Sequence, residues 1–346
     1  MVHMVHLVRR CLFKLSVSRK TYITNFHSST ARPIFTILGQ YQSPYYSTVR
    51  EISGRPERIL PNLIQSWTER LARAEVPEAN SSVNLIVAHA LGKKMIHEVD
   101  MNIVPTEVSL KAIEDMISER LKRVPVQYII GEWDFHDMTL EMKEPVLIPR
   151  PETEELAAMI VNQWPLSRDQ TGRFLEIGCG TGALSMYILR QLPKVTCTAV
   201  DKNETACELT LRNASRYNLQ HRIHVIHGDI RAGIVKLMKP NITFLNISQT
   251  KTVSLINACK FIFSYEDHDA LYGGTDGLDL VRKILTESGK LLKDKQSYVW
   301  LEVGLGHPEK IRRIVELQPK FMLSYKETLK DFTGRGRFCK LQLNTM

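Results

Sequence analysis

The residues best suited to chemistry lie in one short stretch at 174–183, which reads Phe-Leu-Glu-Ile-Gly-Cys-Gly-Thr-Gly-Ala. Its three glycines let the backbone turn sharply and let a ligand approach without meeting a Cβ atom. The apolar residues before the glycines predict a strand, and the residues after them predict a helix whose first N–H groups are available to a ligand. The candidate ligand-binding residues of this loop are Glu176, Gly178, Cys179, Gly180, Thr181 and Gly182.

A carboxylate ends the next predicted strand, because Asp201 lies 23 residues after Gly178. In nucleotide-binding α/β folds, a carboxylate at this place accepts hydrogen bonds from the two ribose hydroxyls. The spacing Gly178-x-Gly180-x-x-Ala183 also satisfies the dinucleotide pattern. A nicotinamide-dependent oxidoreductase is therefore one alternative.

Two features of the loop favour another cofactor. Glu176 lies two residues before the first glycine, where a carboxylate can hold a methionine-type ammonium group or order the loop, and Gly182 extends the motif to G-x-G-x-G. Both resemble motif I of the seven-stranded methyltransferases that depend on S-adenosyl-L-methionine. This resemblance implies that Asp229, after the third predicted strand, contacts the adenine.

The elements that must position these residues divide the chain. Apolar residues at helical spacing predict three helices over 57–123, with Thr106 as the cap of the third. Alternating residues at 127–135 and 139–142 predict a hairpin that turns at His136-Asp137. Thr153 is placed to cap the helix that follows. From 173 onward, strands alternate with helices, which predicts a parallel sheet covered on both faces. The predicted elements are strands 173–177, 195–201, 223–227, 297–303, 321–326 and 337–342 and helices 182–192, 204–216, 278–292 and 308–317.

The charge of the chain is concentrated at its start. The 346 residues have a net charge of +9, but residues 1–50 carry seven basic residues and no acidic one, which leaves +2 for the rest. Apolar and basic residues interleave at 5–15, as in a mitochondrial transit peptide. A basic tail without a targeting role is the alternative. The near-neutral body removes the electrostatic case for direct nucleic-acid binding.

Metal and membrane chemistry have little support in the sequence. The six cysteines include no C-x-x-C pair, which fits neither a zinc site nor a disulfide scaffold, and no metal is expected. No stretch approaches the roughly 18 apolar residues that a membrane span needs. We therefore expect a protein of a reducing compartment.

Several further segments occur in one order and narrow the resemblance. They are Pro125–Phe135, the Ile-Pro-Arg-Pro-Glu-Thr-Glu stretch at 148–154, the glycine loop, Tyr265-Glu266-Asp267 and Gly273–Leu278. Together they resemble the peptide chain release factor glutamine N5-methyltransferases, specifically the mitochondrial branch, over about residues 57–343. The resemblance implies an α/β class I seven-stranded methyltransferase fold with an N-terminal helical domain. It implies S-adenosyl-L-methionine as the cofactor and the glutamine of the Gly-Gly-Gln motif of class 1 release factors as the substrate.

This resemblance and the charge pattern give an organisation in four parts. They are a transit peptide over 1–50, a helical substrate-recognition domain over 57–124, a β-hairpin linker over 125–148 and a methyltransferase domain over 149–343. We expect a monomer of the mitochondrial matrix.

One family motif is missing. In the family, an Asn-Pro-Pro-Tyr motif after the fourth strand accepts the hydrogen bonds of the target amide, and this chain has no such tetrapeptide. The expected place is near 248–252, where Gln249 is a candidate acceptor, Lys251 is unfavourable beside a sulfonium cation, and nothing supplies the rigid Pro-Pro geometry. Either a splice or frameshift artefact replaced part of 245–264, or the chain is an isoform that binds the cofactor but methylates poorly, or a diverged enzyme uses other acceptors.

Arg150 and Glu152 match the family's linker motif and are expected on the substrate side of the site. Their structural alternatives are a pair between Arg150 and a carboxylate, and a favourable charge at a helix start for Glu152. Two other functions also remain open at this point. One is a protein that binds cofactor or release factor without transferring a methyl group, and the other is a nucleic-acid methyltransferase.

Overall fold

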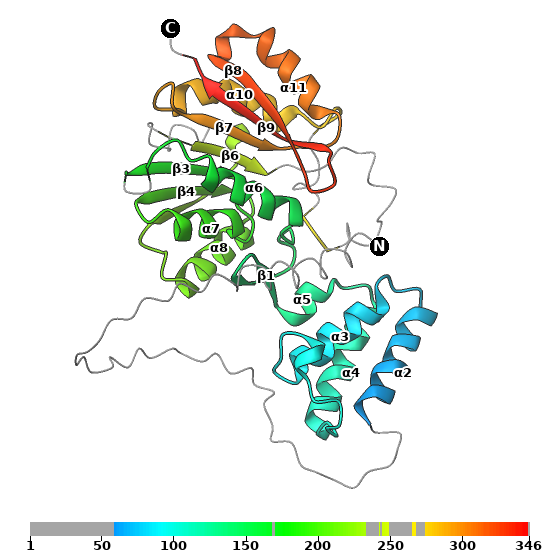
Figure 1. Ribbon diagram of the computed structural model, residues 1–346. Coiled ribbons are helices and arrows are strands. Elements are labelled where there is room, and N and C mark those ends of the chain that lie inside the picture. The colour runs from blue at the N-terminus through cyan, green and yellow to red at the C-terminus, as the bar shows by residue number, and fades with distance from the viewer. Residues whose placement is uncertain are drawn as a thin grey trace, which may run out of the picture. The chain divides into compact units, whose positions relative to one another are not determined.

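The computed structural model describes residues 59–167, 170–232, 242, 244–248, 265–267 and 274–344, with the backbone alone over 244–248 (Figure 1). The expected transit peptide at 1–50 and the candidate Gln249 lie outside the described residues. So does most of 245–264, the segment without the family motif.

Three helices form the N-terminal bundle, as the apolar spacing predicts (Figure 1). They are α2 (Leu60–Arg73), α3 (Ala79–Ala90) and α4 (Glu107–Leu121), and the 3-10 turn η2 (Ile96–Glu98) follows α3. Their buried side chains form one hydrophobic cluster around Trp67, Ile86 and Ile113. Thr106 caps α4, because its hydroxyl accepts a hydrogen bond from the Ser109 N–H at 3.1 Å, so this prediction is confirmed.

The linker begins with a short helix, α5 (Val126–Ile130), where the alternation predicts a strand. That prediction is wrong for 127–130. Pro125 fixes the entry, and Gly131 ends the helix in the left-handed conformation with φ 79°. A short apolar run between such signals does not distinguish a buried helical turn from a strand. The hairpin itself is β1 (Glu132–Phe135) and β2 (Met138–Glu141), which pair antiparallel about His136-Asp137 as predicted.

Helix α6 (Pro151–Asn162) begins earlier than the Thr153 cap predicts. Pro151 occupies the first turn, where its missing N–H is not needed, and Arg150 takes the capping position. Thr153 lies inside the helix, and its hydroxyl donates a hydrogen bond to the Glu302 carboxylate at 2.9 Å. The prediction that Thr153 caps the helix is therefore wrong.

A seven-stranded sheet forms the second part of the fold, in the order β5-β4-β3-β6-β7-β9-β8. Within this sheet, β3, β4, β5, β6 and β7 run parallel, and β9 is antiparallel to both β7 and β8. The strands are β3 (Gly172–Ile177), β4 (Val195–Asp201), β5 (Ile223–His227), β6 (Phe244–Ser248), β7 (Tyr298–Glu302), β8 (Leu323–Lys330) and β9 (Gly336–Leu343). The connecting helices are α7 (Ala183–Gln191), α8 (Glu204–Arg216), α10 (Asp279–Leu291) and α11 (His307–Glu316).

Successive residues of the strands face opposite sides of the sheet, and each side has its own core. Trp300 of β7 packs in the cluster that includes α6 and α7 residues, whereas its neighbour Leu301 packs in the cluster that includes α10 and α11 residues. Helices therefore cover both faces, as the alternation of elements predicts. The carboxyl ends of β3 to β7 meet at one edge, which is where ligands bind in open α/β sheets.

The sequence pattern does not predict β6, which pairs with β3 on one side and β7 on the other. It ends at Ser248, directly before the place where the family motif is missing. Among the residues that the structure describes, no helix has both the length and the apolar character that crossing a bilayer requires.

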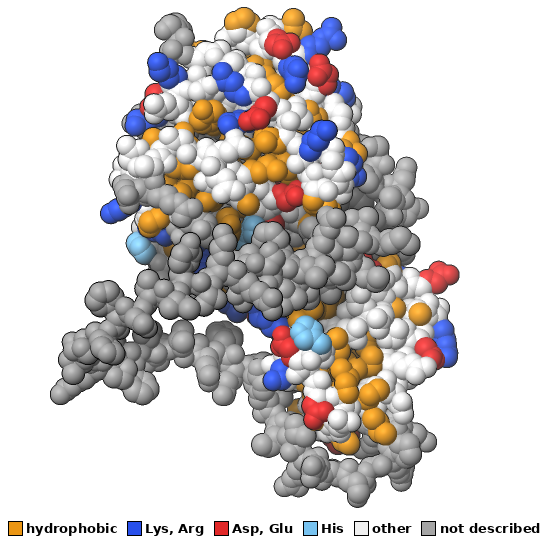
Figure 2. All heavy atoms as spheres, in the orientation of Figure 1, with side chains coloured by type: hydrophobic (Ala, Val, Ile, Leu, Met, Phe, Trp, Pro, Cys, Tyr) orange, Lys and Arg blue, Asp and Glu red, His pale blue; other side chains and the backbone are white. Residues whose placement is uncertain are grey.

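On the face in Figure 2, basic and acidic side chains of the described residues lie interspersed rather than gathered by sign.

Candidate functional site

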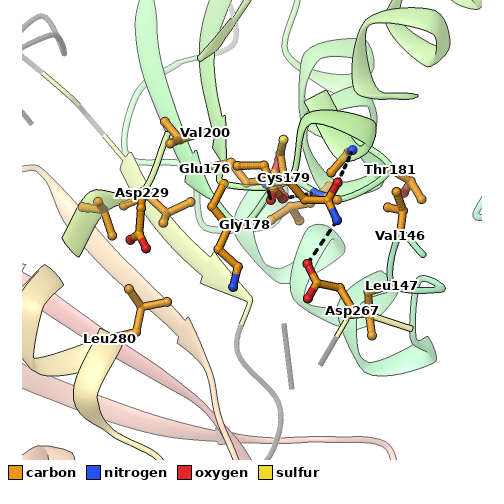
Figure 3. Close-up of a pocket in the computed structure, with 18 of the residues that line it drawn as sticks. Val146, Leu147, Glu176, Gly178, Cys179, Thr181, Val200, Asp229, Asp267 and Leu280 are labelled. Atoms are coloured by element: carbon orange, nitrogen blue, oxygen red, sulfur yellow. Dashed lines mark hydrogen bonds between the residues drawn. The ribbon is translucent and has the colours of Figure 1, made fainter. Parts of the chain in front are cut away.

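A pocket opens at the carboxyl ends of β3, β4 and β5 (Figure 3). In Figure 3, Asp229 and Leu280 lie on one side of it, Leu147 and Asp267 lie on the other, and the glycine loop lies between them. The lining combines the ends of the strands with the linker before α6 and the first turn of α10. Seven of the eight residues predicted to bind the cofactor line this pocket, and the eighth, Gly182, occupies the N-cap position directly before α7.

The glycine loop takes the conformation that its composition predicts. Gly178, Gly180 and Gly182 have φ values of 77°, 54° and 78°, in the left-handed region that favours glycine. The Gly178 N–H donates to the Val200 carbonyl at 2.8 Å, which ties the loop to the end of β4. Cys179 and Thr181, which belong to the loop, are buried and line the pocket.

We expect Gly182→Ala to lower the free energy of unfolding by roughly 2–4 kcal/mol, since an L-residue at this φ costs about 1–2 kcal/mol and crowding adds a similar amount. A Cβ atom at Gly182 would lie 3.0 Å from Cγ2 of Thr210, which is fully buried. Gly306 is the matched control, with φ 80° and no atom within 4 Å of an added Cβ. Urea denaturation should show the smaller loss for Gly306→Ala. Equal losses would mean that the contact with Thr210 contributes nothing.

Glu176 is a buried carboxylate beneath the loop. Its Oε2 accepts hydrogen bonds from the N–H of Ser185, at 3.2 Å, and from the Ser185 hydroxyl. Burial raises the pKa of the Glu176 carboxyl to about 8, although the Ser185 hydrogen bonds act in the opposite direction. Glu176 also lines the pocket, so a cationic ligand group there would favour its ionised form.

Asp201 joins the glycine loop to the start of α8. Its two carboxylate oxygens accept hydrogen bonds from the N–H of Gly180 and the N–H of Asn203, each at 2.9 Å. Burial raises the pKa of Asp201, and these two N–H groups oppose the shift. Because an ionised carboxylate has about four acceptor positions, it can still accept the hydroxyls of a ligand. Asn203 in turn caps α8 by accepting from the Thr205 N–H at 2.9 Å.

Asp229 lies across the pocket from Asp267 (Figure 3), just after β5. The Arg231 guanidinium donates to both of its oxygens, at 2.6–3.0 Å, and holds the pKa of Asp229 below its ordinary value. Arg231 and Lys202 line the same pocket. Asp229 therefore remains ionised and can accept a hydrogen bond from an amino group.

Asp267 and Asn203 also line the pocket, and neither has a role predicted from the sequence. Asp267 accepts a hydrogen bond from the Asn203 side-chain amide at 3.1 Å, and its N–H donates to the Pro145 carbonyl at 2.8 Å. These contacts tie the linker to the end of β4. The only signal was the Tyr265-Glu266-Asp267 segment within the family resemblance, which did not indicate what the aspartate contacts.

Arg150 and Glu152, both predicted on the substrate side, differ in their position. Arg150 lines the pocket and donates to both carboxylate oxygens of the buried Glu266, at 2.6 and 2.7 Å. Glu152 is absent from the lining residues and accepts from the Arg337 guanidinium at 3.4 Å. The structural alternative for Arg150, a pair with a carboxylate, is therefore present, and any contact of either residue with a substrate remains a prediction.

The pocket suits a cofactor that carries a cation, a ribose and a flat ring. S-adenosyl-L-methionine has a sulfonium and an ammonium group, which the carboxylates of the lining complement. The apolar lining suits the adenine, and it includes Val146, Ile177, Val200, Ile230 and Leu280. A glycine loop after the first strand of a seven-stranded sheet, followed by carboxylates at the next two strand ends, defines the class of S-adenosylmethionine-dependent methyltransferases.

Comparison with known proteins gives the family. The PrmC N-terminal domain matches residues 62–131, and the Methyltransferase small domain matches residues 156–243. The human MTRF1L release factor glutamine methyltransferase is 37% identical to this chain. The alignment covers 81% of this chain and 86% of the human protein. The release factor glutamine methyltransferase of Thermodesulfovibrio yellowstonii is 30% identical over 74% of this chain and 90% of its own. The chain belongs to the release factor glutamine methyltransferase family.

The class and its cofactor follow from this membership: the protein is a methyltransferase that uses S-adenosyl-L-methionine. The nicotinamide-dependent oxidoreductase is thereby excluded, although its glycine pattern is present.

Proposed function

We propose that this protein transfers a methyl group from S-adenosyl-L-methionine to the glutamine amide of the Gly-Gly-Gln motif in mitochondrial class 1 release factors. The relatives named for this activity carry the proposal, because the alignment with the human protein covers 81% of the chain. The acid-free basic leader supports a location in the mitochondrial matrix. The near-neutral body supports a protein substrate without direct nucleic-acid binding. The enzyme is proposed to act as a monomer.

We assign the pocket carboxylates to parts of the cofactor. Asp201 would accept the ribose hydroxyls, Asp229 the adenine amino group, and Glu176 would face the methionine part. The N–H groups of the glycine loop and the start of α7 would complete the site. The bound cofactor supplies an electrophilic methyl group, and the chain must hold the acceptor amide in line with it.

Orientation is the main demand on the acceptor side. A carboxamide nitrogen is a poor nucleophile because its lone pair is delocalised, so the rate depends on holding the amide in an attack geometry. The chain lacks the Asn-Pro-Pro-Tyr motif by which the family is expected to do this. Gln249 remains a proposed acceptor, and it lies outside the described residues.

The direct test is incubation of the purified protein with a mitochondrial release factor and methyl-labelled S-adenosyl-L-methionine, followed by peptide mapping. We expect label on the Gly-Gly-Gln glutamine and none on a release factor in which that glutamine is replaced by alanine. Label on other residues, or on added RNA or DNA, would contradict the proposed substrate.

A second candidate function follows from the missing motif. A protein that binds the cofactor and the release factor without transferring a methyl group would show S-adenosylhomocysteine binding by calorimetry and no label in the same assay. Sequencing of a transcript across codons 240–265 separates this candidate from a splice or frameshift artefact. A transcript that encodes this amino-acid sequence would show that the natural protein lacks the motif.

Cofactor binding should be coupled to proton release from Glu176. The pKa of Glu176 in the folded protein, about 8, is above its ordinary value. Between about pH 4 and pH 8 the folded state therefore keeps the Glu176 proton that the unfolded state loses, and the stability contribution of Glu176 falls as pH rises through this window. A cationic ligand beside Glu176 favours the ionised carboxylate instead of the protonated carboxyl. Binding at pH 7 should therefore release up to about one proton, and affinity should rise with pH until about pH 8.

Calorimetry of S-adenosylhomocysteine binding in two buffers with different ionisation heats measures the released protons. We expect Glu176→Gln to release fewer protons per bound ligand than the wild type. Protons that the ligand itself gains or loses are the same in both proteins, so the difference reports Glu176 alone. Glu208→Gln is the matched control, since Glu208 is exposed on α8 and does not line the pocket. The same proton release in Glu176→Gln as in the wild type would contradict the coupling.

A further inference from the structure

Thr153 and Glu302 form a buried polar pair at the ligand-binding edge of the sheet. Glu302 is the last residue of β7 and is fully buried, and Thr153 lies in the first turn of α6. The Thr153 hydroxyl donates to Glu302 Oε2 at 2.9 Å. The pair joins two segments that are 149 residues apart in the sequence, and the cap prediction for Thr153 does not account for it.

The position of the pair relates it to the acceptor side of the site. Glu302 is paired in register with Ser248, the last residue of β6. That strand end is where the family is expected to hold the target amide, and the expected motif is missing there. Thr153 itself lines the pocket, together with Gly178 and Arg150.

The direction of the hydrogen bond determines what the Thr153 hydroxyl can do for a ligand. A hydroxyl has one proton and two acceptor lone pairs, and here the proton is directed to the Glu302 carboxylate. A hydrogen bond to a carboxylate is stronger than a neutral one, and it increases the acceptor strength of the hydroxyl oxygen. Thr153 lines the pocket, and its hydroxyl oxygen is therefore suited to accept an N–H group.

We propose that the Thr153 hydroxyl accepts one N–H of the target carboxamide, and that Glu302 is a positioning residue that orients this hydroxyl. The inference rests on the proposed function, because it requires an amide as the methyl acceptor. It gives the chain an acceptor that does not depend on the Asn-Pro-Pro-Tyr motif. Thr153 would hold the amide for attack: the N–CH3 bond would form as the S–CH3 bond breaks, the sulfur would keep the electron pair as S-adenosylhomocysteine leaves, and the displaced amide proton would pass to solvent.

The test compares Thr153→Val with Thr153→Ser in the release factor assay. Valine keeps the shape of threonine and removes the acceptor, so kcat should fall about tenfold, the typical effect of one lost hydrogen bond. Serine should rescue most of that loss. The dissociation constant for S-adenosylhomocysteine should stay within about threefold of the wild type in both variants, because the Thr153 hydroxyl would contact the substrate amide and not the cofactor.

Two further variants serve as a control and as a second test. Thr286→Val is the matched control, because Thr286 is exposed on α10 and its hydroxyl donates to the Arg282 carbonyl at 2.8 Å. It should keep the wild-type kcat. Glu302→Gln decides the question if Thr153→Val does not fold. Glutamine keeps the shape of Glu302 but is neutral, so it no longer strengthens the Thr153 oxygen as an acceptor, and kcat should fall severalfold with unchanged cofactor affinity.

The outcomes separate this inference from the proposed function. A labelled wild type with an unchanged kcat in Thr153→Val overturns the inference alone. So does a loss of S-adenosylhomocysteine affinity that matches the loss of kcat, because Thr153 would then serve the cofactor. A wild type that leaves the glutamine unlabelled while it binds S-adenosylhomocysteine overturns the proposed function and, with it, the role of Thr153.

Discussion

Asp201→Ala should raise the dissociation constant for S-adenosylhomocysteine by at least about 100-fold, because the wild-type carboxylate would make two hydrogen bonds to the ribose that contribute roughly 1.5–3 kcal/mol each. The substitution also removes the acceptor of the Gly180 and Asn203 N–H groups, so the glycine loop loses its tie to α8. Isothermal titration calorimetry measures the affinity, and the melting temperature without ligand reports the loss of the tie.

Two controls make the Asp201 result specific. Asp115→Ala removes an exposed carboxylate of the helical bundle and should leave the affinity unchanged. Asp201→Asn keeps the size of the side chain, but its amide nitrogen cannot accept a hydrogen bond, so it should also bind weakly. Wild-type affinity in both Asp201 variants would show that the ribose lies elsewhere.

The glycine loop and its carboxylates could be located from the sequence because local signals define them. Strand β4 and helix α8 have the predicted bounds, 195–201 and 204–216. Each is delimited by adjacent residues: Asp201 ends the apolar run, and Asn203 caps the helix. A turn of this kind is determined by the backbone freedom of its glycines, which is visible in the residue types.

The remaining site residues could not be predicted because their roles depend on contacts between distant segments. Asn203 contacts Asp267 across 64 positions, and Thr153 contacts Glu302 across 149. A threonine before an acidic turn has the same local pattern whether it caps a helix or lies buried inside one. The helical turn at 126–130 was likewise ambiguous, since tertiary packing decides short apolar runs.

Arg150→Met should lower the free energy of unfolding by about 3–5 kcal/mol, since removal of one partner leaves a buried charge uncompensated. The Glu266 side chain is 0% exposed, and the Arg150 side chain is 23% exposed. The exposed pair of Arg73 and Glu69, at 81% and 49%, is the matched control. Arg73→Met should cost at most about 1 kcal/mol in the same urea denaturation experiment. Equal losses would contradict a special role for burial.

The double variant Arg150→Met/Glu266→Gln then separates the two interpretations of Arg150. Neutralising both partners removes the uncompensated charge, so at least half of the lost stability should return, and the two substitutions should be strongly non-additive. If Arg150 only pairs with Glu266, the transfer rate recovers together with the stability. If Arg150 also contacts the substrate, the rate stays low in a protein whose stability and S-adenosylhomocysteine affinity are restored, because the guanidinium of this pocket-lining residue is still absent.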